Sequence, residues 1–167
     1  MPDARDRPAQ GSGIGAYVRR YPQYRYLFGP ASISGLYGPE AISRLVYFYE
    51  THYASHELAV TARNPFKIGP EQKQAFAVEC QGRDRDEAFR SLRDQLSKQG
   101  LQVPTLYKHY AQAAEPDGVY FGAFNLDPQF NDCVDAFVLV DLERLKPRKR
   151  KRYLGGELLA QASTETP

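Results

Sequence analysis

The most constraining feature of this sequence is the continuously apolar run Ala136–Val140, which lies inside the β-rich segment Val134–Asp141. A half-exposed strand alternates apolar and polar side chains, whereas a continuous apolar run is typical of a strand covered on both faces. A second β-rich segment, Val119–Phe124, precedes it, and the connection Asn125–Cys133 is rich in turn-forming Asn, Asp and Pro. The sequence therefore predicts an antiparallel strand pair with Val134–Asp141 at the centre of a sheet.

Apolar residues at helical spacing surround this strand pair. We expect helices at four places: residues 14–21, 39–53, 85–99, and from 104 toward Pro116. Residues 24–28 predict a strand. We expect a bend or bulge at Gly29 and Pro30 between this strand and residues 31–34, because proline and glycine interrupt central strands. Residues 56–83 predict a loop-rich region with one short helix at most. Together these elements predict a mixed α/β fold.

The length and composition predict one folded domain with polar ends. A chain of 167 residues, 42% of them hydrophobic, is the size of one ordinary domain. We expect residues 13–154 to fold, and the polar residues 1–12 and 155–167 to form disordered tails. No apolar run reaches the roughly 18 to 20 residues that cross a bilayer, and the N-terminus does not resemble a signal peptide. The expected location is the cytoplasm.

Basic residues are concentrated near the end of the expected domain. The chain has 22 Lys and Arg residues and 20 Asp and Glu residues, and the basic ones gather in a strip: Lys146, Arg148, Lys149, Arg150, Lys151 and Arg152. Such a strip is a solvated helix end, a contact for anionic lipid on the inner face of the cytoplasmic membrane, or a docking site for an acidic acyl carrier protein. A nucleic-acid-binding module is a further alternative, but the rest of the chain is acidic and has no nucleic-acid-binding motif, so we expect no nucleic-acid partner.

Three stretches are more specific than these patterns. They are Gly13-Ile14-Gly15-Ala16-Tyr17 with the following Tyr24-Arg25-Tyr26-Leu27-Phe28-Gly29-Pro30-Ala31-Ser32-Ile33-Ser34; Phe124-Asn125-Leu126-Asp127-Pro128-Gln129-Phe130; and Asp135–Asp141 with Leu145-Lys146-Pro147-Arg148. In this order they resemble the hemolysin-like branch of the GNAT acyltransferase superfamily, which includes ornithine N-acyltransferases. The resemblance covers about residues 13–155.

The resemblance implies a GNAT-like mixed sheet with flanking helices and an enzyme that transfers a fatty acyl group to an amine. The implied donor is acyl carrier protein, or acyl-CoA, with no bound cofactor, and the implied acceptor is an amino acid such as ornithine in bacterial membrane lipid synthesis. In that superfamily a strand and a phosphate-binding loop that hold the thioester precede the helix that here begins near Gly13. We therefore expect only the distal half of the fold, completed by an upstream acyltransferase half or by a homodimer. A non-catalytic remnant or accessory subunit is the alternative.

Few side chains are expected to be obligatory for acyl transfer, because positioning and backbone donors supply much of the catalysis. The candidates lie mostly between the two strands: Asp127 and Asp135 as the base, and Asn125, Asn131 and Glu50 as acceptor-binding residues. The alternative is that Asn125 and Asp127 only shape turns through local hydrogen bonds. We assign no metal ligands, because the i, i+4 pair His52 and His56 has no apparent third ligand.

Overall fold

The computed structural model describes residues 12–55 and 58–154. The elements follow one another as α1 (Ser12–Arg20), β1 (Tyr26–Ile33), α2 (Gly38–His52), α3 (Pro70–Cys80), α4 (Arg85–Lys98), α5 (Thr105–Ala111), β2 (Val119–Asp127), β3 (Cys133–Asp141) and α6 (Pro147–Leu154). Short 3-10 turns precede α2 and flank β2 and β3. This is the mixed α/β architecture that the sequence predicts. The two expected tails fall outside the described residues, except for Ser12, which begins α1.

The three described strands form one antiparallel sheet in the order β1-β3-β2, so β3 is central, as predicted. The expected break at Gly29 and Pro30 is wrong, because β1 pairs with β3 without interruption from Tyr26 to Ile33. Among the described strands β1 is an edge, and an edge is where a sheet tolerates a proline that has no N–H to donate.

The connection between β2 and β3 is shorter than the sequence predicts. Both strands extend toward it, so that only residues 128–132 remain outside the ladder. The far side of β2 is also paired, because the Phe66 N–H donates to the Phe124 carbonyl at 2.9 Å and the Leu126 N–H donates to the Asn64 carbonyl at 2.8 Å. Pairing on both sides thus keeps the Asn- and Asp-containing residues 125–127 in a strand, although their composition is typical of a turn.

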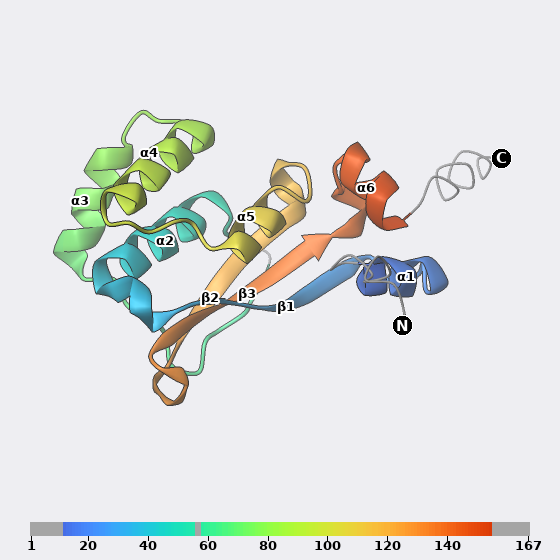
Figure 1. Cartoon of the computed structure of the whole chain (residues 1–167), viewed down its shortest axis with the longest axis horizontal. Coiled ribbons are helices and arrows are strands. Elements are labelled where there is room, and N and C mark those ends of the chain that lie inside the picture. The colour runs from blue at the N-terminus through green and yellow to red at the C-terminus, as the bar shows by residue number, and fades with distance from the viewer. Residues whose placement is uncertain (1–11, 56–57, 155–167) are drawn as a thin grey trace, which may run out of the picture.

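Helices cover one face of this sheet (Figure 1). The ring of Phe121 in β2 contacts Tyr49 of α2 and Tyr107 of α5, with ring centres 4.5 and 5.1 Å apart. Helices α3 and α4 pack against α2, and α4 begins with the predicted capping box between Asp84 and Glu87. The core therefore lies between β1 to β3 and the α2 and α5 layer.

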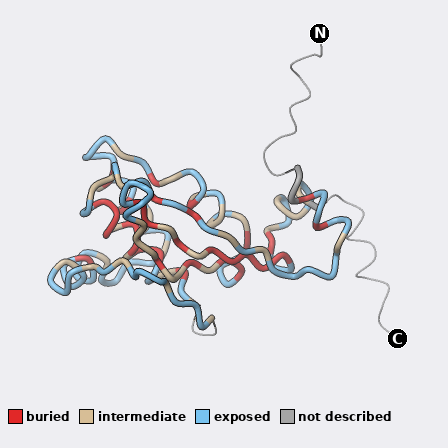
Figure 2. Tube along the Cα trace, turned by 90° about the horizontal axis from the view of Figure 1, so that it is seen from below, coloured by how far each residue is buried: buried red, intermediate tan, exposed pale blue. Residues whose placement is uncertain are grey.

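The opposite face of the sheet, called the open face below, has no helix over it among the described residues. Tyr26, Phe28 and Ser32 of β1 are exposed there, and Phe137 of β3 is only partly buried. Figure 2 shows the chain trace coloured by burial, with the buried residues concentrated toward the middle of the molecule. Strand β3 is nonetheless mostly buried on both faces, as its apolar run predicts, because Cys133, Leu139 and Asp141 on the open face are buried. Side chains of the neighbouring strand contribute to this cover, since the ring of Phe28 stacks on that of Phe137 at 5.7 Å.

Helices α1 and α6 lie together at one end of the molecule, beyond the sheet (Figure 1). Gly15 of α1 is pressed against the backbone of Tyr153 in α6, and a Cβ at this position would collide with the Tyr153 carbonyl. Helix α1 matches the helix expected over 14–21, and α3 is the short helix expected in the loop-rich region. Helix α5 ends at Ala111, earlier than expected.

Candidate functional site

The sheet register places three polar residues in one row across the open face. Ser32 of β1 pairs with Asp135 of β3, and Asp135 pairs with Asn125 of β2. In the next row Asp127 pairs with Cys133. Side chains of paired residues stand on the same face, and alternate residues along a strand share that face. Both proposed catalytic carboxylates and Asn125 therefore lie on the open face near the β2–β3 turn.

A β-bulge in β2 produces this arrangement. The register shifts by one residue between Gly122 and Asn125, and Ala123 there has a positive φ of 49°. One extra residue moves every following side chain of the strand to the other face. The bulge turns Phe124 into the core, where it is 3% exposed, and turns Asn125 and Asp127 outward.

Asp135 has the closest polar contacts in this row. The Ser32 hydroxyl donates to its Oδ1 at 2.5 Å, and the Cys133 Sγ lies 3.7 Å from the same oxygen. Burial, followed by the negative charges of Asp135 and Asp127, raises the pKa of the Cys133 thiol above its usual value. The sequence analysis did not select Ser32 as a site residue. Its position between two apolar residues of a strand, Ala31 and Ile33, would have placed it on the face opposite the core.

Asp127 makes the local turn hydrogen bonds that the alternative interpretation expects, whereas Asn125 binds the backbone of a segment distant in the sequence. The Asn125 Oδ1 accepts from the Asn64 N–H at 2.8 Å. The Asp127 Oδ1 accepts from the Gln129 and Phe130 N–H groups at 2.9 and 3.2 Å and caps the 3-10 turn over residues 128–130. Both side chains therefore stabilise the edge and the turn of this hairpin, whatever else they do.

The structure separates the other two acceptor-binding candidates. Asn131 lies in the hairpin turn in the left-handed conformation, with φ at 55°, and its carbonyl packs against Gly35. Glu50 lies near the end of α2, twelve residues after Gly38, which is about 18 Å along the helix axis. Burial raises the pKa of Glu50, and Lys73 of α3 partly opposes this effect. Asn131 therefore borders the polar row, whereas Glu50 does not.

Five of the six basic residues of the strip lie in helix α6, and Lys146 directly precedes it. Arg148, Lys151 and Arg152 are exposed, while Lys146, Lys149 and Arg150 are partly buried. The Arg150 Nη1 donates to the Glu143 carbonyl at 3.4 Å, and its Nε is buried with no partner among the described residues. The three exposed cations remain available for an anionic partner.

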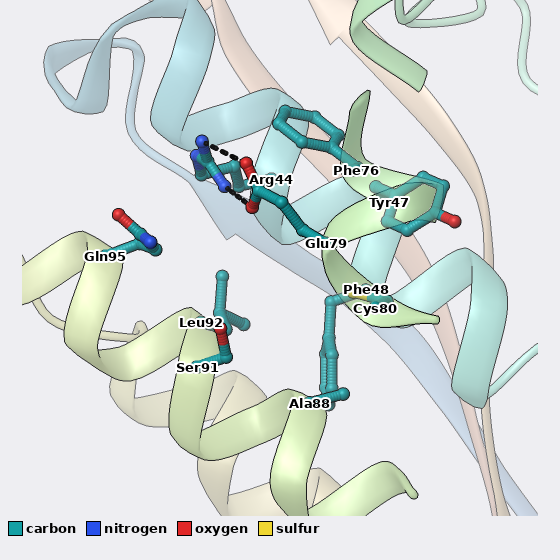
Figure 3. A pocket seen from close by; sticks show the side chains of 10 residues that line it. All are labelled: Arg44, Tyr47, Phe48, Phe76, Glu79, Cys80, Ala88, Ser91, Leu92 and Gln95. Carbon is teal, nitrogen blue, oxygen red and sulfur yellow. Dashed lines mark hydrogen bonds and ion pairs between the residues drawn. The ribbon is translucent and has the colours of Figure 1, made fainter. Parts of the chain in front are cut away.

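A cavity between α2, α3 and α4 does not resemble a substrate site. Its volume is about 30 Å³, room for roughly one water molecule. Figure 3 shows its polar end, where Arg44 pairs with Glu79 at 2.6 Å, and its apolar wall, which includes Phe76 and Leu92. We interpret it as a gap in the packing of these helices.

Three further properties concern only residues 12–55 and 58–154. No three His, Cys, Asp or Glu side chains gather there in a way that could hold a metal ion, and His56 lies outside the described residues. None of the helices in this part of the chain is long and apolar enough to span a bilayer. Cys80 and Cys133 are free thiols.

Two curated proteins are similar to this chain. Both are named glycine N(alpha)-acyltransferase, one from Bacteroides thetaiotaomicron and one from Phocaeicola vulgatus, and each is 21% identical over 142 residues. The match covers 85% of this chain but only 41% and 43% of the two relatives, so the chain spans about two fifths of their length. No family model and no solved structure matches the chain significantly. These similarities relate the chain to N-acyltransferases, while the ornithine-lipid branch expected from the sequence stays a prediction.

Proposed function

We propose that this chain forms the acceptor side of an N-acyltransferase, which moves a fatty acyl group from a thioester to the α-amine of an amino acid. The observation that supports this most is the similarity over 85% of the chain to two glycine N(alpha)-acyltransferases. The sequence resemblance to ornithine N-acyltransferases points to the same chemistry, because glycine and ornithine both present an α-amine beside a carboxylate.

The proposed acceptor site is the polar row on the open face. In the reaction the amine nitrogen attacks the thioester carbonyl carbon, a C–N bond forms and the C–S bond breaks. The amine must lose its protons, and the leaving thiolate must gain one. Asp135 is the proposed base, because its Oδ1 already accepts the Ser32 hydrogen bond at a partly exposed position. Asp127 on the neighbouring strand adds negative charge that attracts an ammonium group.

The proposed donor is acyl carrier protein or acyl-CoA. The cavity between α2, α3 and α4, at about 30 Å³, is too small for an acyl chain. A larger hollow of about 380 Å³ beside Thr51, His52 and Arg85 is open to solvent and mainly polar. We propose that the upstream half or the second copy that the resemblance implies contributes part of the donor site.

The test is transfer of a radiolabelled fatty acyl group to glycine and, separately, to ornithine. Each reaction is run once with the acyl thioester of acyl carrier protein as donor and once with acyl-CoA. The enzyme is either the chain alone or the chain joined to any polypeptide encoded upstream of Met1. We expect an N-acyl amino acid in at least one combination, and the acceptor that reacts faster decides between the two amino acids. Absence of product in every combination would contradict the proposal.

Variants connect the activity with the polar row. We expect Asp135→Asn to reduce kcat by about 100-fold, the usual contribution of a general base, and Ser32→Ala to reduce it less. Asp94→Asn on the exposed side of α4 makes the same chemical change far from the row and should leave kcat unchanged. Equal activity of Asp135→Asn and Asp94→Asn would exclude Asp135 as the base.

The second candidate is a non-catalytic accessory subunit or remnant. This candidate is favoured by the hydrogen bonds that the Asn125 and Asp127 side chains accept from the backbone, because they explain both residues by a structural role alone. The donors are the N–H groups of Asn64, Gln129 and Phe130. An accessory subunit would raise the acyl-transfer activity of a partner chain without needing Asp135. The Asp135→Asn variant assayed in the complex therefore separates the two candidates.

A further inference from the structure

Helices α1 and α6 come from opposite ends of the described chain and lie side by side at one end of the molecule (Figure 1). Besides the close approach of Gly15 to Tyr153, the Arg19 Nη1 donates to the Tyr153 carbonyl at 2.8 Å. We name residues 15–24 and 146–153 together the α1/α6 surface. The strip on α6 is thus only part of a larger basic region.

The charge on the α1/α6 surface has one sign. It contains eight of the 22 basic residues of the chain, the two arginines of α1 and the six of the strip, and none of the 20 acidic residues. No ion pair between described residues uses any of these eight side chains. Arg19 and Arg20 are exposed, as are Arg148, Lys151 and Arg152. An uncompensated basic surface of this kind attracts an anionic partner.

Three tyrosines complete this surface. Tyr17 and Tyr21 have ring centres 4.8 Å apart, and Tyr24 lies 6.0 Å from Tyr17 and 6.3 Å from Tyr21. Tyr17 is 51% exposed and Tyr24 is 48% exposed, so this cluster is not part of the core. Arg20 lies over the Tyr21 ring at 5.8 Å. Tyrosine rings beside basic side chains are typical of the boundary between lipid headgroups and acyl chains, where one end of the ring is apolar and the other is hydrated.

We propose that the α1/α6 surface binds the surface of a membrane that contains anionic phospholipid. Basic side chains attract the headgroups, and the tyrosines insert at the interface. Binding of an acidic carrier protein would require only the basic side chains and would not account for the exposed tyrosines. Nucleic-acid bases stack on open aromatic faces, but Tyr17 and Tyr24 already stack on each other, with ring planes 22° apart. A lipid surface is therefore the partner that uses both properties.

This proposal is independent of acyl transfer, because membrane binding is measured with neither donor nor acceptor present. The experiment is sedimentation of the purified chain with vesicles of phosphatidylcholine, with and without phosphatidylglycerol. We expect binding only to the phosphatidylglycerol vesicles, and weaker binding as the salt concentration rises. Equal binding to both kinds of vesicle, or binding to neither, would overturn the proposal.

Matched charge reversals test the surface itself. The double variant Lys151→Glu with Arg152→Glu should lower vesicle binding by more than about tenfold. Arg90→Glu with Arg93→Glu makes the same charge change at exposed positions of α4 and should leave binding unchanged. If both doubles reduce binding equally, net charge and not this surface is responsible, and the proposal fails.

A tyrosine double variant and two competitors distinguish the partner. Tyr17→Ser with Tyr24→Ser should weaken vesicle binding while its salt dependence remains, and circular dichroism checks that the fold is retained. Acyl carrier protein and a single-stranded oligonucleotide are then titrated separately under the same conditions. Tighter binding of either one than of the phosphatidylglycerol vesicles, abolished by the Lys151 and Arg152 reversals, would assign the surface to that partner instead.

Discussion

Among single residues, Asp141 is the buried carboxylate of an ion pair with Arg25. Its side chain is 5% exposed, accepts from the Arg25 Nη2 at 2.8 Å, and also accepts from the Glu143 N–H at 3.0 Å. Burial alone would raise the pKa of Asp141, but these hydrogen bonds outweigh it and hold the pKa below its ordinary value. Asp141 thereby ties the start of β1 to the end of β3.

We expect Asp141→Asn to lower the free energy of unfolding by about 1 to 3 kcal/mol at neutral pH. A depressed pKa gives stability that is present above about pH 4 and is lost as the pH falls through the folded-state pKa. The free energy of unfolding measured with urea should therefore decrease in acid for the wild type. It should decrease less for Asp141→Asn. Glu143→Gln, at an exposed partner of Arg25, should change stability by less than about 0.5 kcal/mol. Equal effects of the two variants would contradict the prediction.

Two buried tyrosines of the same core differ in the partner of the hydroxyl group. The Tyr107 hydroxyl donates to the Ala31 carbonyl at 3.0 Å, whereas the Tyr49 hydroxyl is buried with no partner among the described residues. We expect Tyr107→Phe to destabilise the protein by about 1 to 2 kcal/mol, and Tyr49→Phe to be neutral or stabilising. Chemical denaturation of both variants measures the difference, and the opposite order would show that Tyr49 has a hydrogen bond in solution.

Among the elements, strand β2 depends on its bulge. Ala123 occupies a conformation that glycine adopts without strain and that β-branched residues rarely adopt. Ala123→Gly should therefore leave the melting temperature unchanged or raise it slightly. Ala123→Val should lower the free energy of unfolding by about 1 to 3 kcal/mol. Val would either adopt the strained positive φ or shift the strand out of the register that places Asn125 on the open face. Thermal unfolding tests the stability, and similar melting temperatures for the two variants would show that the bulge is not strained.

The packing of α1 on α6 is another property of elements. Gly15→Ala places a methyl group against the Tyr153 carbonyl, whereas Gly29→Ala in β1 meets nothing within 4 Å. We expect Gly15→Ala to cost about 1 to 3 kcal/mol and to make α6 more sensitive to proteolysis. Gly29→Ala should be neutral or slightly stabilising. Equal protease sensitivity of the two variants would contradict this account of the α1–α6 contact.

For the whole molecule, the open face and the free edge of β1 predict self-association. Phe28 on this edge strand is 74% exposed, and β1 pairs on one side only among the described residues. Unpaired edges and exposed apolar side chains promote association between copies. Light scattering after size exclusion should show a mass that rises with concentration, and Phe28→Lys should reduce this rise. A wild-type monomer at every concentration would contradict the prediction.

The sequence by itself determined the elements whose signals are local. The helical spacing after Pro39 and the Asp84–Glu87 capping box predicted α2 and α4, because capping and amphipathic spacing act within one or two turns of chain. The apolar segment Val134–Asp141 likewise predicted the central strand, and the family motifs indicated the relationship to N-acyltransferases. The basic strip was also visible in the sequence.

Only the tertiary structure decided what depends on contacts between distant segments. The pairing of β1 with β3 kept Pro30 in a strand, and pairing with residues 64–66 kept Asn125 and Asp127 in β2, against their local turn propensity. The bulge at Ala123 then set which face these side chains occupy, and the register brought Ser32 to Asp135 across 103 residues of sequence. Such contacts depend on which segments meet, and local sequence patterns contain no information about that choice.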